Sequence, residues 1–115
     1  MANENLQIQS LAGTRNGHKI LRLAGALTLQ TVFNFQSAVR AETEPILILD
    51  FSGVPYLDSS GLGAIIGAFV SMQRAQRKLA LAGANAQVNA LLDMTRVRQL
   101  LPAYATVEEA EAALG

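Results

Sequence analysis

A chain of 115 residues is long enough for one domain with its own hydrophobic core and too short for two. Nine lysines and arginines balance nine acidic residues, so charge gives no reason to expect nucleic acid as a partner. The sequence has no cysteine, which excludes disulfides and thiolate chemistry, and no apolar run approaches the roughly 20 residues of a membrane span. Because the start also lacks the basic and apolar segments of a signal peptide, we expect a cytoplasmic protein with no membrane partner.

The N-terminal part of the chain predicts an antiparallel hairpin. Apolar and polar residues alternate over residues 6–11 and 19–27, which is the pattern of half-buried strands. Asn16-Gly17 lies between them, and this dipeptide is typical of a tight type I′ turn with positive φ at both central residues. His18 adjoins this turn and is the only histidine of the chain. We expect it to be a solvated surface residue and not a general base.

Helices and strands alternate through the rest of the chain. The predicted elements are a helix over residues 28–43, a strand over 46–49, a helix over 59–78, a strand over 79–81, a helix around 88–92 and a terminal helix after a capping box at residues 106–109. Residues 46–49 are apolar on both faces, so this strand should lie centrally with cover on both sides. The order predicts an α/β fold: a mixed sheet of four or five strands, antiparallel at the hairpin and parallel afterwards, with helices packed against it.

Helical spacing also predicts one buried face. In the first helix the spacing of Leu29, Val32, Phe33 and Gln36 indicates only that the segment is helical, whereas in the second a buried stripe is predicted through Leu62, Ile65, Ile66, Phe69 and Val70. Small residues recur every fourth position of the second helix, at Gly63, Gly67 and Ser71. Such a stripe permits either close helix packing or a flat exposed surface.

The start of the second helix is the most informative part of the sequence. Asp58 is placed to cap this helix, and Ser59 follows at its first position. Unpaired N–H groups and the helix dipole favour an anion there. A phosphate on Ser59 would gain from this field and be repelled by Asp58, so the fold would tolerate it while the surface changed. Plain capping, with Ser59 and Ser60 as ordinary first-turn residues, is the alternative.

Other chemistries fit this segment poorly. Gly61-x-Gly63-x3-Gly67 resembles a relaxed dinucleotide fingerprint, but it follows a long loop instead of the tight turn after a first strand. The sequence has no G-x-S-x-G elbow for a hydrolase and no G-x4-G-K-[ST] phosphate loop. Histidine and carboxylates show no metal-ligand spacing. We therefore expect no cofactor, no metal and no catalysis by the chain itself.

The segment Tyr56-Leu57-Asp58-Ser59-Ser60-Gly61-Leu62-Gly63 resembles the signature of the STAS domain, specifically that of the bacterial anti-sigma-factor antagonists. The similarity covers nearly the whole chain, with further matches at Arg22-Leu23-Ala24-Gly25, Leu47 to Ser52, Leu92-Asp93-Met94-Thr95 and Leu100-Leu101-Pro102. It implies a single STAS domain over residues 1–115 and a non-catalytic switch. In this family the unphosphorylated form binds an anti-sigma-factor serine kinase and so frees the sigma factor. The kinase ends the interaction by phosphorylating a serine, and a phosphatase resets it.

The resemblance also implies the site residues. The family's acceptor directly follows the motif aspartate, which is Ser59 here, and Ser60 is the second choice. The implied partner-binding face comprises Ala26, Leu27, Thr28, Asp58, Ser59, Ser60, Gly61, Leu62, Gly63 and Gly67. Two positions depart from the family pattern: residues 26–28 stand where many members carry acidic residues, and Arg96 where glycine is common.

Three questions stay open on the sequence alone. A constitutive STAS interaction module of a scaffold or a transporter-associated complex is the first alternative function. A small phosphate- or nucleotide-binding domain is the second. The sequence is compatible with either a monomer or a weak dimer.

Overall fold

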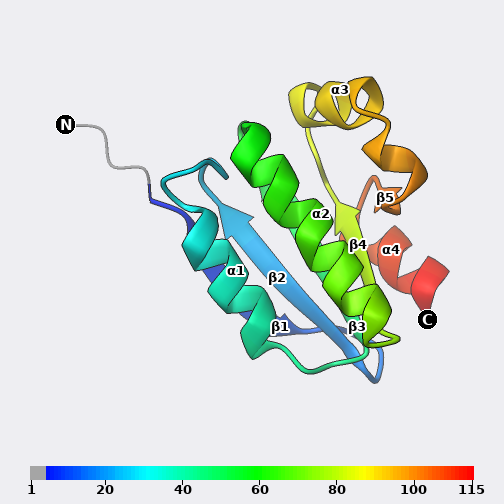
Figure 1. Ribbon diagram of the computed structural model, residues 1–115. Coiled ribbons are helices and arrows are strands. Elements are labelled where there is room, and N and C mark those ends of the chain that lie inside the picture. The colour runs from blue at the N-terminus through cyan, green and yellow to red at the C-terminus, as the bar shows by residue number, and fades with distance from the viewer. Residues whose placement is uncertain (1–4) are drawn as a thin grey trace.

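The computed structural model describes residues 5–115, which form one sheet with helices on both of its faces (Figure 1). The sheet has five strands in the order β1-β2-β3-β4-β5. The strands are β1 (Gln7–Ala12), β2 (His18–Ala24), β3 (Ile46–Gly53), β4 (Lys78–Ala82) and β5 (Ala103–Tyr104). β1 and β2 are antiparallel, and all other neighbours are parallel. The prediction of an α/β fold with a mixed sheet is confirmed, with five strands as the count.

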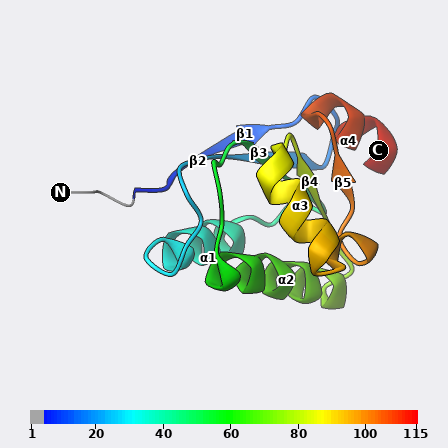
Figure 2. The same ribbon diagram turned by 90° about the horizontal axis from the view of Figure 1, so that it is seen from above.

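Helices α1 and α2 pack side by side on one face of the sheet, and α4 lies against the other (Figure 2). The helices are α1 (Val32–Ala41), α2 (Ser59–Arg74), α3 (Ala86–Met94), the short 3-10 helix η1 (Val97–Gln99) and α4 (Val107–Leu114). Helix α2 begins after β3 and α3 begins after β4. Because these two strands are parallel, both helices begin at the same edge of the sheet. This edge, at the carboxyl ends of β3 and β4, carries the segment singled out above.

The core has two unequal parts because β3 is buried on both faces. Leu47 and Leu49 belong to the large cluster beneath the helices, together with Phe35 of α1 and Ile65 of α2. Ile48 points the opposite way into a small cluster that α4 covers. The prediction of a central strand with cover on both sides is therefore confirmed.

The hairpin differs from its prediction. Strand β1 ends at Ala12 and β2 begins at His18, so a longer loop over residues 13–17 replaces the tight turn. Of Asn16 and Gly17, only Gly17 has positive φ, at 84°, which excludes type I′. The loop is shaped by a side chain from the far end of the sequence.

That side chain is Glu111 of α4, and it also overturns the expectation for His18. His18 is only 4% exposed, and its Nδ1 lies 3.1 Å from Oε1 of Glu111. The same oxygen accepts the N–H groups of Thr14 and Arg15 at 2.9 and 3.2 Å. The prediction of a solvated histidine was wrong because α4, distant in sequence, covers the loop.

Helix α1 is shorter than predicted. Residues before Val32 form a turn in which Thr31 Oγ1 accepts the Thr28 N–H at 3.0 Å and donates to the Ala26 carbonyl at 2.9 Å. As a result Leu29 and Phe33, two residues of the predicted helical pattern, are 62% and 74% exposed. The core side of α1 consists of Val32, Phe35 and Val39.

Helix α2 begins at Ser59 as predicted but ends at Arg74 and not at Lys78. Gln76 takes φ of 61°, which breaks the helix, and Lys78 already belongs to β4. Ile65 is buried as expected, whereas Val70 is exposed.

Candidate functional site

The start of α2 is held by the Asp58 carboxylate. Its Oδ1 accepts the N–H of Gly61 at 2.8 Å, which confirms Asp58 as the N-cap. Its Oδ2 accepts the N–H of Leu29 at 3.2 Å, so the same carboxylate also fixes the loop before α1. Both oxygens are thus used structurally, and Asp58 is directed at backbone groups instead of at Ser59.

Two loops meet at this point. Leu27 and Leu57 form an isolated parallel bridge. The Leu27 N–H donates to the Tyr56 carbonyl, and the Asp58 N–H donates to the Leu27 carbonyl, each at 3.2 Å. The loop after β2 and the loop after β3 therefore form one rigid platform from which α2 projects.

Asn85 holds the other side of the platform, and sequence reasoning missed it. Its Oδ1 caps α3 by accepting the Val88 N–H at 2.8 Å. Its Nδ2 donates to the carbonyls of Val54 and Pro55 at 3.3 and 3.0 Å. An asparagine just before a helical pattern signals the cap, but only the fold reveals the contact with the loop after β3.

Ser59 is exposed, and Ser60 is half-buried. Among residues 5–115, the backbone N–H groups of Ser59 and Ser60 have no hydrogen-bond acceptor, as expected for the first turn of a helix. An anion on Ser59 would therefore find free donors and the positive end of the dipole of a long helix. The exposed hydroxyl that a modifying enzyme needs is present at Ser59.

The implied partner-binding residues fall into three groups by exposure. Ser59, Gly63 and Gly67 are exposed on α2. The half-buried members are Ala26, Asp58, Ser60 and Leu62. The buried members are Leu27, Thr28 and Gly61, which build the platform and present no side chain to a partner.

Gly61 is required by close packing of α2 on the platform. A Cβ at this position would overlap the carbonyl oxygen of Leu27. We expect Gly61→Ala to lower the free energy of unfolding by about 1–3 kcal/mol, because the loop must shift. Urea unfolding measures this, with Gly63→Ala as the control: a Cβ at Gly63 meets nothing within 4 Å, and alanine there should add about 0.5–1 kcal/mol. Equal stability of the two variants would contradict this account.

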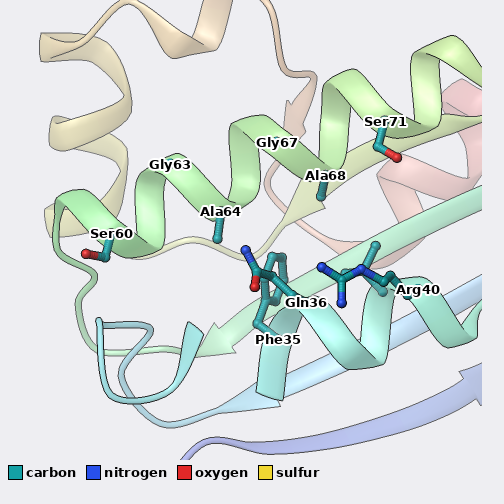
Figure 3. Close-up of a pocket in the computed structure, with 10 residues that line it drawn as sticks. Phe35, Gln36, Arg40, Ser60, Gly63, Ala64, Gly67, Ala68 and Ser71 are labelled. Carbon is teal, nitrogen blue, oxygen red and sulfur yellow. The ribbon is translucent and has the colours of Figure 1, made fainter. Parts of the chain in front are cut away.

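A groove of about 470 Å³ runs between α1 and α2 (Figure 3). Its α2 wall begins at Ser60 and consists of the small residues Gly63, Ala64, Gly67, Ala68 and Ser71. Its α1 wall carries Phe35, Gln36, Val39 and Arg40. Because a Cβ at Gly63 or Gly67 would meet open space, the small stripe is an exposed flat surface and does not serve packing inside the chain.

A second, apolar groove lies on the other side of the α2 start. It is about 300 Å³ in volume and includes Tyr56, Leu91 and Met94, and the side chains of Tyr56 and Met94 are exposed. Sequence reasoning named Tyr56 and Met94 only as parts of motifs that resemble the STAS domain and gave them no binding role, since each alone looks like an ordinary apolar residue.

The described part of the chain has no candidate metal cluster and no candidate membrane-spanning helix. Residues 5–115 contain no group of three histidines or acidic residues placed to hold a metal ion. No helix in this range is long and apolar enough to cross a membrane.

Comparison with known proteins decides the family. The sequence pattern of the STAS domain matches residues 10–110. The chain belongs to the STAS domain family. Among curated STAS relatives, the anti-sigma F factor antagonist of Paenibacillus polymyxa is 29% identical over 104 residues, which cover 87% of each chain.

Solved structures support the STAS fold. The chain matches an anti-sigma factor antagonist from Mycobacterium paratuberculosis with a TM-score of 0.85 and 18% identity, over 97% of this chain and 96% of the other. It also matches the STAS domain of a SulP transporter from Vibrio cholerae with a TM-score of 0.67 and 24% identity, over 89% and 84%. At these identities the matches establish the fold of the STAS domain and leave its partner to be argued from the site.

Arg96, where the resemblance implies a glycine, lies in a turn with positive φ. This residue precedes η1 with φ of 62°, the left-handed conformation that glycine adopts most easily. The arginine holds this conformation at a cost of about 1–2 kcal/mol.

Proposed function

We propose that this STAS domain is an anti-sigma-factor antagonist that acts in the cytoplasm and is switched at Ser59. Its unphosphorylated form binds an anti-sigma-factor serine kinase and so releases the sigma factor. Phosphorylation of Ser59 ends the binding, and a cognate phosphatase restores it. The observation that carries the proposal is the exposed hydroxyl of Ser59 at the first position of α2, on a platform fixed by Asp58 and Asn85.

The charge of the site favours a phosphate as the switch. A phosphoserine carries about 1.5 to 2 negative charges and three strong acceptor oxygens. At Ser59 those oxygens would be close to the unpaired N–H groups of the first turn, which compensate the repulsion from Asp58. The fold keeps its stability while the surface beside the groove gains about 1.5 to 2 negative charges.

The chemistry of phosphoryl transfer must come from the partner. Both oxygens of Asp58 accept backbone N–H groups, so this carboxylate is held away from the role of a base toward Ser59. The only histidine is buried against Glu111, on the far side of the sheet from α2. We therefore propose a binding protein and not an enzyme.

A constitutive interaction module is the second candidate. The segment 26–28 has no carboxylate, so this part of the surface that a kinase of this family would approach lacks negative charge. The Thr28 hydroxyl is also engaged, because it donates to Gln30 within the loop. The similarity of the fold to a transporter STAS domain agrees with this reading. A pull-down from native cell extract with wild type and Ser59→Asp distinguishes the two. Loss of the bound kinase with Ser59→Asp supports the switch, and an unchanged set of partners supports the module.

The groove between α1 and α2 should contribute to the binding surface. Gly67→Leu places a side chain in space that is open in the free protein, and leucine is a better helix former than glycine. We expect affinity for the kinase to fall by at least about tenfold while the free energy of unfolding stays equal or rises by up to about 1 kcal/mol. Calorimetric titration measures the affinity. Gln73→Leu, at an exposed position of α2 outside the groove, is the control and should bind like wild type.

Gly67→Leu is expected to lower the affinity for the kinase without lowering the free energy of unfolding, and this combination distinguishes a blocked groove from misfolding. A variant that binds less because it is misfolded would also unfold more easily. Unchanged affinity of Gly67→Leu would remove the groove from the binding surface.

A further inference from the structure

We propose that two copies of this chain associate through β1, each adding its free edge to the same strand of the other. The two edges of the sheet are built differently. β5 has two residues and follows Pro102, and both short length and proline protect an edge from further pairing. β1 has six residues, Gln-Ile-Gln-Ser-Leu-Ala, without charge or proline. In the described chain, β1 pairs with β2 alone, so its outer edge has no strand beside it.

The outward backbone groups of β1 follow from its register. The Gly13 N–H donates to the His18 carbonyl at 3.0 Å, which marks these two residues as facing each other's backbone. In an antiparallel ladder such pairs recur at every second residue, so Gln9 and Leu11 also direct their N–H and C=O groups toward β2. The alternate residues Ile8, Ser10 and Ala12 direct theirs away from the sheet.

These outward residues are self-complementary. An antiparallel copy with Ser10 opposite Ser10 places Ile8 opposite Ala12 and Ala12 opposite Ile8. Every outward N–H and C=O group of the three residues then has a partner. The arrangement is a closed two-fold dimer, which leaves the joined sheet with only the two protected β5 edges.

The charges around β1 do not oppose a second copy. The neighbouring strand β2 carries Lys19 and Arg22, and each has an acidic partner: Lys19 lies 3.9 Å from Glu42, and Arg22 lies 3.5 Å from Asp50. β1 itself carries no charged side chain, and the carboxylate beside its centre, Glu42, accepts from Ser10 Oγ at 2.7 Å and is already paired with Lys19. A second copy presents an edge of the same length and polarity, so it is the occupant that fits best. A single pair of strands buries little area, so the dimer should be weak and depend on concentration.

Ser10→Pro tests this edge with little effect on the fold. The proline removes the N–H that points outward, while Gln9 and Leu11 keep the ladder with β2. Sedimentation equilibrium over a range of concentrations should show a monomer–dimer equilibrium for wild type. We expect a dissociation constant at least about tenfold higher for Ser10→Pro. Ser10→Ala is the matched control: it loses the hydroxyl that donates to Glu42 at 2.7 Å but keeps the N–H, and should dimerise like wild type.

Hydrogen exchange of the wild-type chain supplies an independent measurement. Amides of Ile8, Ser10 and Ala12 should exchange more slowly as concentration rises, whereas those of Gln9 and Leu11 should be protected at every concentration. A chain that stays monomeric at millimolar concentration overturns the proposal. So does a dimer that Ser10→Pro leaves intact, or protection that appears on α1 and α2 instead of β1.

Discussion

Ser59→Ala is expected to abolish phosphorylation by the cognate kinase while leaving binding of that kinase intact. Ser59 is the exposed hydroxyl at the start of α2, and alanine removes the acceptor oxygen without touching the Asp58 cap or the bridge between Leu27 and Leu57. Ser59→Asp, by contrast, adds a negative charge to the same surface and should weaken binding by at least about tenfold, because an interface matched to a neutral hydroxyl must now accommodate a charge. Intact-mass analysis after incubation with kinase and ATP measures the first effect, and titration of the kinase measures the second.

Ser60→Ala is the matched control for the acceptor. Ser60 is half-buried at the end of the groove between α1 and α2, so its hydroxyl is less accessible. This variant should gain one phosphate, as wild type does. Phosphate found on Ser59→Ala, or lost from Ser60→Ala, would move the acceptor to Ser60.

Glu111→Ala should cause the largest loss of stability of any single substitution considered. Its carboxyl group is buried and holds the loop between β1 and β2 through the N–H groups of Thr14 and Arg15, the Thr14 hydroxyl and the His18 ring. Alanine would leave the buried His18 ring without its partner and would release the Thr14 and Arg15 N–H groups that fix the loop. We expect the free energy of unfolding to fall by about 3 kcal/mol, which corresponds to a melting temperature lower by roughly 10 °C or more.

Thermal and urea unfolding measure this loss, and Glu108→Ala controls for removing a carboxylate from α4. Glu108 is exposed in the first turn of the same helix, so its loss should cost at most about 1 kcal/mol through the dipole. Because the site at Ser59 lies on the opposite face of the sheet, binding of the kinase by folded Glu111→Ala should match wild type. Similar stability of the two variants would contradict the buried role of Glu111.

Features with a local cause were predictable from the sequence. The start of α2 is one, because an aspartate before a helical pattern has few other uses than capping, and the structure confirms the contact from Asp58 to Gly61. The capping box was half right: Thr106 accepts the Glu109 N–H at 3.1 Å. The apolar run of β3 predicted its central place for a similar reason, since a strand that is apolar on both faces needs cover on both.

Features that depend on distant partners were not predictable. His18 is buried because Glu111 reaches it from α4, and no spacing within the hairpin signals that contact. Phe33 has helical spacing, but it is exposed. The Thr31 hydroxyl donates to the Ala26 carbonyl in the turn before α1, and the helix that follows directs Phe35 toward the core. The exposure of the implied binding residues could not be predicted either. Leu27, Thr28 and Gly61 are buried because the loop after β2 packs against the loop after β3 and the start of α2.

The contacts between Glu111 and the loop after β1 also affect the order in which the chain folds. They join a loop near the beginning of the sequence to the last helix, with sequence separations of 93 to 97 residues. Closing so long a segment costs more entropy than forming the adjacent β-α-β units, so these contacts should appear after the rest of the sheet. We expect substitutions at Glu111 to speed unfolding and leave the refolding rate almost unchanged. On the ribosome, the first hairpin would reach its final form only once α4 has emerged.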